Sequence, residues 1–434
     1  MLVGAEFASV TAILVRSRAI LARGSARNER SRAKLARHDV IFVRRRIEWN
    51  RFENFHMLTI HLRSLPVSLR LAMFSLVVAA FHQGASQVPT PPARVSTQEP
   101  KPPFPYRIED VTIDSKPGVR LSATITLPAG RGPFPAAVLV CGSGPHDRNG
   151  GGGAWKPFLV IADYFARRGI ATIRYDKRGV ARSTGNYASS TSLDFADDAE
   201  AAVRFLATRR DVDQTHIGIL GHSEGGMIAP IIAVRSPSVA FVVLLAAPGL
   251  PGDTLMLRQV AIRDTAAGKD PESDPDLLEN RRLYAALRAA RDSTDAALRL
   301  NSVEAEVTAA MPERAREAAR QRLDRKRAIL ITPFWRFFSL YDPRPTLRAL
   351  RKPVLAVTGT LDVQAPAKEN LPEIAAALKA AGNRDFSVVE MAGLNHLFQT
   401  SAGVAPADYD KIDEIVAPRA LSVITNWIRM HVEH

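Results

Sequence analysis

The sequence predicts an α/β fold: a mostly parallel sheet with helices on both faces and a helical cap insertion. Apolar runs of strand length alternate with helical segments over most of the chain, which favours a parallel sheet covered on both sides. One run, residues 217–220, leads directly into the motif Gly-His-Ser-Glu-Gly at residues 221–225. A strand, a sharp turn carrying a serine, and a helix make up a nucleophile elbow. Ser223 is therefore the first candidate for a catalytic nucleophile.

The strands are expected in two groups. Residues 111–114 and 119–126 alternate apolar and polar side chains, as half-exposed antiparallel strands do. The parallel part of the sheet is expected from six apolar runs, at residues 136–141, 171–175, 216–221, 239–246, 353–358 and 385–390.

This alternation stops between the fourth and fifth of the six runs. Residues 255–330 are rich in Ala, Leu, Arg and Glu at helical spacing and contain no convincing strand. An insertion at this point would cover an active site, so we expect a helical cap at about 250–345. Trp335 and Phe338, in an aromatic cluster of this insertion, are the candidate substrate-binding residues. Plain packing of the cap onto the body is the alternative explanation of the cluster.

The 434-residue chain carries a net charge of +14, which raises the question of a nucleic-acid partner. Residues 1–56 contain twelve Lys or Arg residues and five Asp or Glu residues, so half of the excess lies in this basic N-terminal extension. The rest is dispersed, and neither an RNA-binding signature nor zinc-ligand spacing occurs. We therefore expect no nucleic-acid partner and no metal.

Residues 57–86 have the pattern of a secretory signal peptide. Basic residues after Met57 precede a short, largely apolar run at residues 69–81, and small residues suited to cleavage follow at Ala85 and Ser86. We expect translation to start at Met57, so that the basic extension reflects a misassigned start, and we expect export to the periplasm or the medium. The apolar run is too short for a stable membrane span, so none is expected after cleavage.

Residues 87–106 are expected to form an extended linker, because seven prolines occur between residues 88 and 106. The folded body is expected over residues 107–434. The chain has a single cysteine, so no intrachain disulfide can form. As an alternative nucleophile, Cys141 would need a nearby base, and His146 is the only local candidate.

A serine nucleophile needs a base that is itself oriented by a carboxylate. In the fold that uses a nucleophile elbow, the chain order is Ser, then Asp or Glu, then His. Of the ten histidines, three follow Ser223, and two of these lie at the chain terminus, which leaves His396. Asp362 follows a buried-strand pattern and a Gly-containing turn, so it is the candidate acid. Asp342 is the rival, but it follows no strand and is interpreted as a turn or helix-stop residue.

An acyl-transfer site also needs N–H donors for the oxyanion that develops during the reaction. The amide of Glu224, directly after the nucleophile, is the first candidate. The second is the amide of Ser143, in the Gly-containing segment 141–145 at the end of the expected strand 136–141. A simple Gly-rich turn is the alternative interpretation of this segment.

Five sequence blocks together resemble the α/β-hydrolase superfamily, and within it a bacterial serine esterase branch related to serine aminopeptidases and acylaminoacyl-peptidase-like enzymes. They lie at residues 140–148, 174–179, 221–226, 359–362 and 393–399, and the resemblance spans about residues 107–434. It implies an α/β-hydrolase fold and a triad of Ser223, Asp362 and His396. This triad would hydrolyse carboxylic esters of small to medium acyl chain through an acyl-enzyme, without metal or organic cofactor.

The resemblance has two departures. Ala181 stands where relatives usually have glycine, and Cys141 where many esterases have histidine. Neither is a triad position. Asp176 and Arg178, in the second block, are interpreted as structural charges that fix the loop after the fourth strand.

Two other functions remain open. The same elbow occurs in related aminopeptidases, so a serine peptidase is one alternative, and a catalytically silent hydrolase-fold binding protein is the other. The expected partner is a small-molecule ester.

Overall fold

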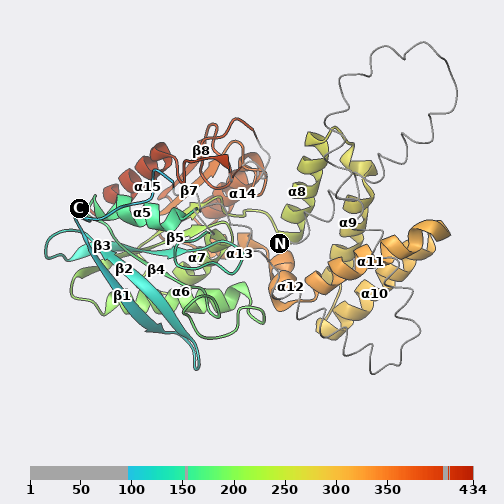
Figure 1. The fold of residues 1–434 in the computed structure, drawn as a ribbon, viewed down its shortest axis with the longest axis horizontal. Helices are drawn as coiled ribbons and strands as arrows, with labels where there is room; N and C mark the ends of the chain where they lie inside the picture. Colours follow the sequence, from blue (N-terminus) through green and yellow to red (C-terminus); the bar gives the residue numbers. More distant parts are fainter. Residues whose placement is uncertain (1–95, 152–154, 404–408, 410, 434) are drawn as a thin grey trace, which may run out of the picture. The chain divides into compact units, whose positions relative to one another are not determined.

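The computed structural model describes residues 96–151, 155–403, 409 and 411–433. The basic extension, the expected signal peptide and the first part of the expected linker lie outside these described residues. The folded body contains an eight-stranded sheet with the order β1-β2-β4-β3-β5-β6-β7-β8 (Figure 1). The sequence-based expectation of an α/β fold with a mostly parallel sheet is confirmed.

The antiparallel strands lie at one edge of the sheet. β2 pairs with β1 and with β4 in antiparallel orientation, and every later neighbour pair is parallel. β4, β6 and β7 are buried along their whole length, because helices cover both faces of the parallel part. The strands are β1 (Arg107–Asp114), β2 (Arg120–Leu127), β3 (Phe134–Val140), β4 (Ala171–Tyr175), β5 (Val212–His222), β6 (Phe241–Leu245), β7 (Val354–Gly359) and β8 (Phe386–Met391).

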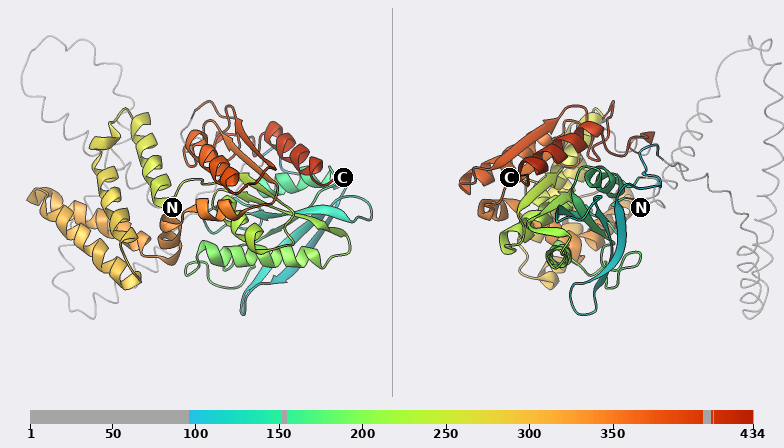
Figure 2. Two further views of the ribbon diagram at one scale, coloured as in Figure 1. Left: turned by 180° about the vertical axis from the view of Figure 1, so that it is seen from behind. Right: turned by 90° about the vertical axis from the view of Figure 1, so that its left-hand side faces the viewer.

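Helices lie on both sides of the sheet (Figure 2), and a hydrophobic core lies on each of its two faces. Successive strand residues point to opposite faces, so Val138 belongs to one core and its neighbour Leu139 to the other. The core that contains Leu139 includes Phe165 of α5 (Pro157–Ala166) and Ile424 of α15 (Pro418–Met430). The core that contains Val138 is covered by α6 (Ser192–Ala207), α7 (Glu224–Arg235), α13 (Pro343–Ala349) and α14 (Ala367–Ala380).

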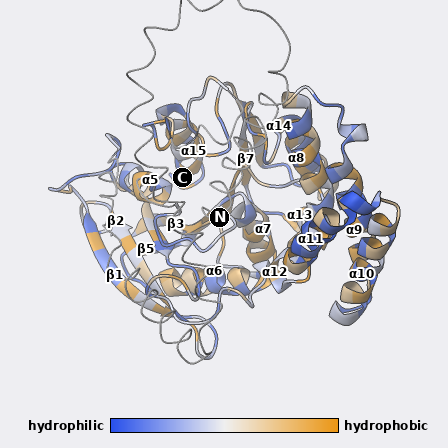
Figure 3. Ribbon diagram, turned by 45° about the vertical axis from the view of Figure 1, so that its right-hand side comes forward, coloured by the Kyte–Doolittle hydropathy of each residue, from blue (hydrophilic) through white to orange (hydrophobic). Residues whose placement is uncertain are grey.

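The helical cap follows β6 and precedes β7, as the loss of strand pattern predicts. It consists of α8 (Gly252–Ala266), a short 3-10 helix (Pro271–Ser273), α9 (Pro275–Arg288), α10 (Ser293–Ala309), α11 (Glu313–Leu330) and α12 (Pro333–Leu340). The cap has a small hydrophobic core of its own, which includes Leu283, Leu287, Leu300 and Leu323. α11 buries few side chains, and Figure 3 shows much of it as hydrophilic. The cap therefore has a weaker internal core than the sheet body.

The described part of the expected linker is attached to the body. The Ser96 hydroxyl donates to the Asp413 carbonyl, and Gln98 Nε2 donates to the Val416 carbonyl at 2.9 Å. Glu99 forms an ion pair with Lys156, just before α5. These side-chain contacts hold residues 96–99 to the body. None of the helices in the described part of the chain combines the length and apolar character needed to cross a membrane.

Candidate active site

The nucleophile elbow lies between β5 and α7. Ser223 has a φ of 54° and a ψ of −117°, a backbone conformation that residues other than glycine rarely adopt. Its N–H donates to the carbonyl of Leu245 at 2.8 Å, which ties the turn to the end of β6. The serine side chain is thereby presented at the carboxyl end of the parallel strands.

Two glycines of the elbow are required by close approach of the backbone. A Cβ atom on Gly221 would lie 2.0 Å from the carbonyl oxygen of Gly225. A Cβ atom on Gly225 would lie 2.1 Å from the carbonyl oxygen of Val140, at the end of β3. Real Cβ atoms do not approach oxygen so closely, so any side chain at either position would force the turn apart. This explains in physical terms why the motif has glycine on both sides of the serine.

His396 and Asp362 form a buried hydrogen-bonded pair. His396 Nδ1 lies 2.9 Å from Asp362 Oδ2 and 3.0 Å from Oδ1, and both residues are 4% exposed. Asp362 Oδ1 also accepts hydrogen bonds from the backbone N–H groups of Gln364 and Ala365, both at 2.8 Å. Because the carboxylate can only accept, Nδ1 carries the proton and Nε2 is the basic nitrogen of the ring.

The environment of Asp362 keeps its carboxyl ionised. Burial alone would raise its pKa, but the His396 imidazole and the amides of Ala365 and Gln364 outweigh burial and hold the pKa below its ordinary value. A carboxylate at this place fixes the tautomer of His396 and can stabilise the imidazolium that forms when the ring takes up a proton.

The loop that carries His396 is held by buried amide side chains. Asn395 Oδ1 accepts from the N–H groups of Leu397 and Gln399, each at 3.0 Å, and Asn395 Nδ2 donates to Gln399 Oε1 at 2.9 Å. Gln399 Nε2 in turn donates to the Glu414 carbonyl at 2.9 Å. Neither Asn395 nor Gln399 is among the site residues predicted from the sequence. Their position in the same block as His396 was the available signal.

A cavity of about 240 Å³ borders the elbow. Ser223, His396 and Ser143 line it, and so do Trp335 and Phe338 of the cap, the two candidate substrate-binding residues. Among the described residues that line it, none is Asp, Glu, Lys or Arg. The lining also includes residues that the sequence analysis did not propose as substrate contacts, namely His146, Trp155, His222, Leu255, Met256, Gln259 and Gln364.

His222, inside the elbow motif, contacts the backbone of His396. Its Nε2 lies 3.0 Å from the His396 carbonyl oxygen, and the two rings are 4.9 Å apart. Burial, together with the neighbouring His396, lowers the pKa of His222 to about 3. The ring is therefore neutral at working pH, and its Nε2–H donates to the carbonyl. The motif pattern fixes only the serine and the glycines, so it does not reveal this contact.

The two candidate oxyanion donors lie beside the serine. A Cβ atom on Gly142 would be 3.1 Å from Ser223 Cβ, which shows how closely segment 141–145 passes the candidate nucleophile. No acceptor is recorded for the Ser143 N–H among the described residues, whereas the next amide, Gly144, donates to the Tyr187 hydroxyl at 3.1 Å. The Glu224 N–H is the first amide of α7 and so has no acceptor within that helix.

The surroundings of Asp342, the rival candidate acid, and of Cys141, the alternative nucleophile, indicate structural roles. The Asp342 carboxylate accepts from the Arg344 N–H at 3.0 Å at the start of α13, as expected for a helix or turn residue. Cys141 is 5% exposed, and burial raises the pKa of its thiol to about 12. The thiolate is the reactive form of cysteine, so this side chain is a poor nucleophile at neutral pH.

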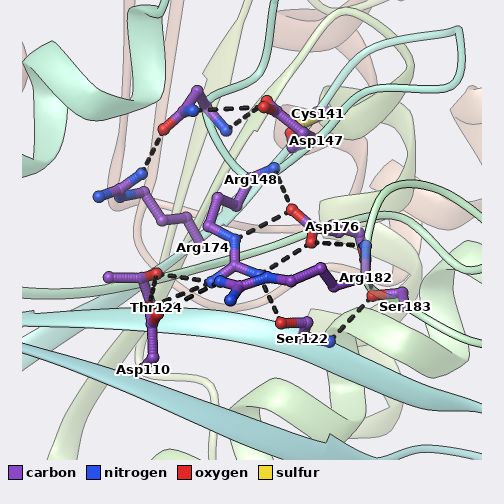
Figure 4. Close-up of polar contacts among 11 residues, drawn as sticks. Asp110, Ser122, Thr124, Cys141, Asp147, Arg148, Arg174, Asp176, Arg182 and Ser183 are labelled. Carbon is purple, nitrogen blue, oxygen red and sulfur yellow. Dashed lines mark hydrogen bonds and ion pairs between the residues drawn. The ribbon is translucent and has the colours of Figure 1, made fainter.

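The charged residues after β4 form buried networks, and Figure 4 shows the network around Asp176. Arg148 donates from its backbone N–H and from Nε to Asp176 Oδ1, at 2.9 and 3.0 Å, and from Nη1 to Thr124 Oγ1 at 2.8 Å. Arg178 pairs with Asp198, with Nε at 2.7 Å from Oδ2. Both pairs are almost completely buried. This agrees with the interpretation of Asp176 and Arg178 as structural charges.

A second, more open hollow of about 640 Å³ lies on the cap and does not include the elbow. Arg316, Arg320 and Arg327 line it, and each of them pairs with a carboxylate of the cap. Within the part of the chain that the structure describes, no group of three or more His, Cys, Asp or Glu side chains is placed to hold a metal ion.

The chain is similar to several known proteins. The chain is 27% identical over 333 residues to Esterase EstD of Thermotoga maritima, which covers 75% of this chain and 68% of that protein. An esterase of Pyrococcus furiosus superposes with a TM-score of 0.47 at 13% identity, covering 75% of this chain and 91% of that chain. The proline iminopeptidase of Mycobacterium smegmatis superposes with a TM-score of 0.44 at 18% identity, covering 74% and 98%.

The strand order of the sheet and the elbow between β5 and α7 agree with the family whose model the sequence matches. Residues 137–396, more than half of the chain, match the alpha/beta hydrolase fold family. The chain therefore belongs to the alpha/beta hydrolase family.

Proposed function

We propose that this hydrolase is a serine esterase that cleaves carboxylic esters of small to medium acyl chain. The observation that carries the proposal is the shared cavity of Ser223 and His396, with Asp362 bonded to the far side of the imidazole ring. The relationship to Esterase EstD supports the same reaction class. A cavity of about 240 Å³ suits a confined acyl group.

In the proposed mechanism, Ser223 and His396 act in both acylation and deacylation. Ser223 Oγ attacks the ester carbonyl while His396 Nε2 takes its proton, and the amides of Ser143 and Glu224 donate to the oxyanion. His396 then gives the proton to the leaving alcohol. A water molecule, deprotonated by the same imidazole, attacks the acyl-enzyme, and the acid is released as Ser223 regains its proton.

The lining of the cavity favours an ester over the substrate of an aminopeptidase. An aminopeptidase must hold a charged α-amino group, and a buried ammonium needs a carboxylate partner. None of the described lining residues is acidic. Peptidase activity therefore remains the second candidate, favoured only by the shared elbow motif.

Hydrolysis of a p-nitrophenyl ester series from acetate to palmitate tests the proposal, with Ser223→Ala measured beside the native chain. Activity is expected to peak at short acyl chains, and Ser223→Ala should lower kcat by about a million-fold. The matching p-nitroanilides separate esterase from peptidase. Activity on the anilides alone would replace the esterase proposal, and an alanine variant that keeps more than a few per cent of activity would exclude Ser223 as nucleophile.

We also propose that the enzyme is exported, because of the signal-peptide pattern after Met57. Intact-mass measurement of the enzyme recovered from its native host, beside fractionation of that host, tests this. A protein that begins near Ala85 and lies outside the cytoplasm is expected. A cytoplasmic protein that retains residues before Met57 would contradict both the start and the export.

A further inference from the structure

We propose that Lys177 and Glu224 are a buried positioning pair that holds the two oxyanion donors of this site in place. The inference rests on the proposed function and goes beyond it, because it assigns a role to two side chains that do not line the cavity. Lys177 lies in the loop after β4, and the Glu224 side chain projects from the first residue of α7. The residues are 3% and 0% exposed.

The Lys177 ammonium contacts a carbonyl oxygen, a carboxylate and an aromatic ring. It donates to the Gly142 carbonyl oxygen at 2.8 Å and to Glu224 Oε2 at 3.1 Å. It also lies over the ring of Phe195, 4.3 Å from the centroid. A buried ammonium that is fully partnered has a fixed position, so it can fix the groups that it contacts.

The contact with Gly142 acts on the first oxyanion donor. The Gly142 carbonyl and the Ser143 N–H belong to the same planar trans peptide, in which the oxygen and the hydrogen point in opposite directions. A cation that holds the oxygen therefore fixes the direction of the N–H on the opposite side. It also draws electron density toward the oxygen, which makes the N–H a stronger hydrogen-bond donor.

The contact with Glu224 acts on the second donor. Glu224 Oε2 accepts from Lys177, and Oε1 accepts from the Ser192 hydroxyl at 2.7 Å. Both carboxylate oxygens are thus engaged, which anchors the residue whose backbone N–H is the other proposed donor. The ion pair consequently joins segment 141–145 to the start of α7, and it sets the distance between the two donors.

The loop that carries Lys177 is itself rigidly held. Asp176 accepts three hydrogen bonds from Arg148, and the Ser183 hydroxyl donates to the Asp176 carbonyl at 2.7 Å (Figure 4). The Lys177 N–H donates to the His146 carbonyl at 3.2 Å. These contacts place the ammonium without any help from substrate.

Fluorophosphonate labelling of the full chain, followed by intact mass, tests the proposal. Ser223 Oγ forms a bond to phosphorus, the P–F bond breaks, fluoride leaves, and the serine proton passes to His396. The phosphoryl oxygen then occupies the oxyanion position, so the labelling rate reports on the donors even if the natural ester is unknown. Lys177→Met should lower the labelling rate and the kcat for p-nitrophenyl acetate by about 10- to 100-fold, with KM unchanged.

The matched control is Arg178→Met. It breaks an equally buried ion pair at the adjacent residue, with Asp198, and that pair does not contact Gly142. It should lower the melting temperature and leave the labelling rate within about threefold of native. An equal fall in both variants would indicate general disorder of the loop and overturn the positioning role. A Lys177→Met variant that labels as fast as the native chain would overturn it as well.

Lys177→Met also leaves the Glu224 carboxylate buried without its cation, which destabilises the fold. The double variant Lys177→Met/Glu224→Met removes both charges and should recover much of the lost melting temperature while labelling stays slow. Recovery of the labelling rate together with the melting temperature would show a structural role only. A native chain that does not label at all, or a Ser223→Ala variant that labels equally, would instead contradict the proposed nucleophile.

Discussion

The ion pairs beside the elbow in the sheet body differ in burial from the surface ion pairs of the helical cap. In the body, Lys177 pairs with Glu224 and Arg178 with Asp198, and all four side chains are 7% exposed or less. In the cap, pairs such as Arg281 with Glu272 lie on the surface, with side chains 44% and 68% exposed. Buried charges orient the loops beside the elbow, whereas surface pairs of this kind add little to stability. The body should therefore set the rate of reaction, and the cap should set the shape of the acyl site.

The largest effect is expected from replacing Asp362, the buried candidate acid of the sheet body. Asp362→Asn is expected to lower kcat by about ten thousand-fold, because an amide neither stabilises the imidazolium nor enforces the Nδ1–H tautomer of His396. Esterase assays beside circular dichroism measure this loss in a folded protein. Asp342→Asn is the matched control, since Asn also caps helices well. An equal loss in the control would favour Asp342 as the acid.

The next prediction compares the hydrophobic core of the cap with the core of the sheet body that contains Val138. Leu206 of α6 and Leu323 of α11 are both 0% exposed, and each belongs to a different cluster. Changing either to alanine should cost about 2–5 kcal/mol of local stability. Leu323→Ala should increase hydrogen exchange in α9 to α11 and leave Ser223 labelling unchanged, whereas Leu206→Ala should lower the stability of the whole body. Body-wide exchange in Leu323→Ala would contradict a separate cap core.

Acid should destabilise the body through His222. Its pKa is about 3 in the folded state and about 6.5 in an unfolded chain, so below pH 6.5 the unfolded chain binds a proton that the folded protein does not. The free energy of unfolding should therefore fall as pH drops from 6.5 toward 3, by at most about 1.4 kcal/mol per pH unit. His222 borders a cavity, so the measured slope should lie below this maximum.

Urea unfolding at pH 7, 6, 5 and 4.5 measures this slope. His222→Asn should make it shallower, because the substituted side chain does not titrate. The expected cap, residues 250–345, contains no histidine in the sequence, so its core should not contribute to this change between pH 6.5 and 5. An unchanged slope in His222→Asn would assign the acid sensitivity to other groups, of which His146, whose pKa burial also lowers, is the first to test.

The smallest effect concerns substrate selection by the cap. Trp335 lines the cavity and lies 5.9 Å from the ring of Phe338, so Trp335→Ala should enlarge the acyl site. The ratio of kcat/KM for octanoate over acetate should rise by about tenfold. Phe337→Ala, in the same helix but outside the cavity lining, should leave the ratio unchanged. Reduced stability with the same chain-length preference in Trp335→Ala would show that the aromatic cluster only packs the cap onto the body.

The body and the cap also differ in what the sequence could predict. The strands were predicted within a few residues, and so were the places of Ser223 and Asp362 at strand ends, because local apolar patterns and a fixed chain order determine them. Lys177 was not identified as a positioning residue, since its partner Glu224 lies 47 positions further along the chain. The cap was predicted as helical, and the candidates Trp335 and Phe338 border the cavity whereas Phe337 does not, but helical periodicity gives no physical reason for choosing among the aromatic residues of this cluster.

The contacts of Arg148 also bear on how this enzyme can be divided or grafted. Its guanidinium bonds to Thr124 in β2 and to Asp110 in β1, and both strands precede residue 137, where the family match begins. A fragment that starts there would keep the elbow but would remove three partners of this nearly buried cation, since Ser122 of β2 also bonds to it, and would expose one edge of β4. As a unit for recombination between relatives, the catalytic module therefore includes the two N-terminal strands.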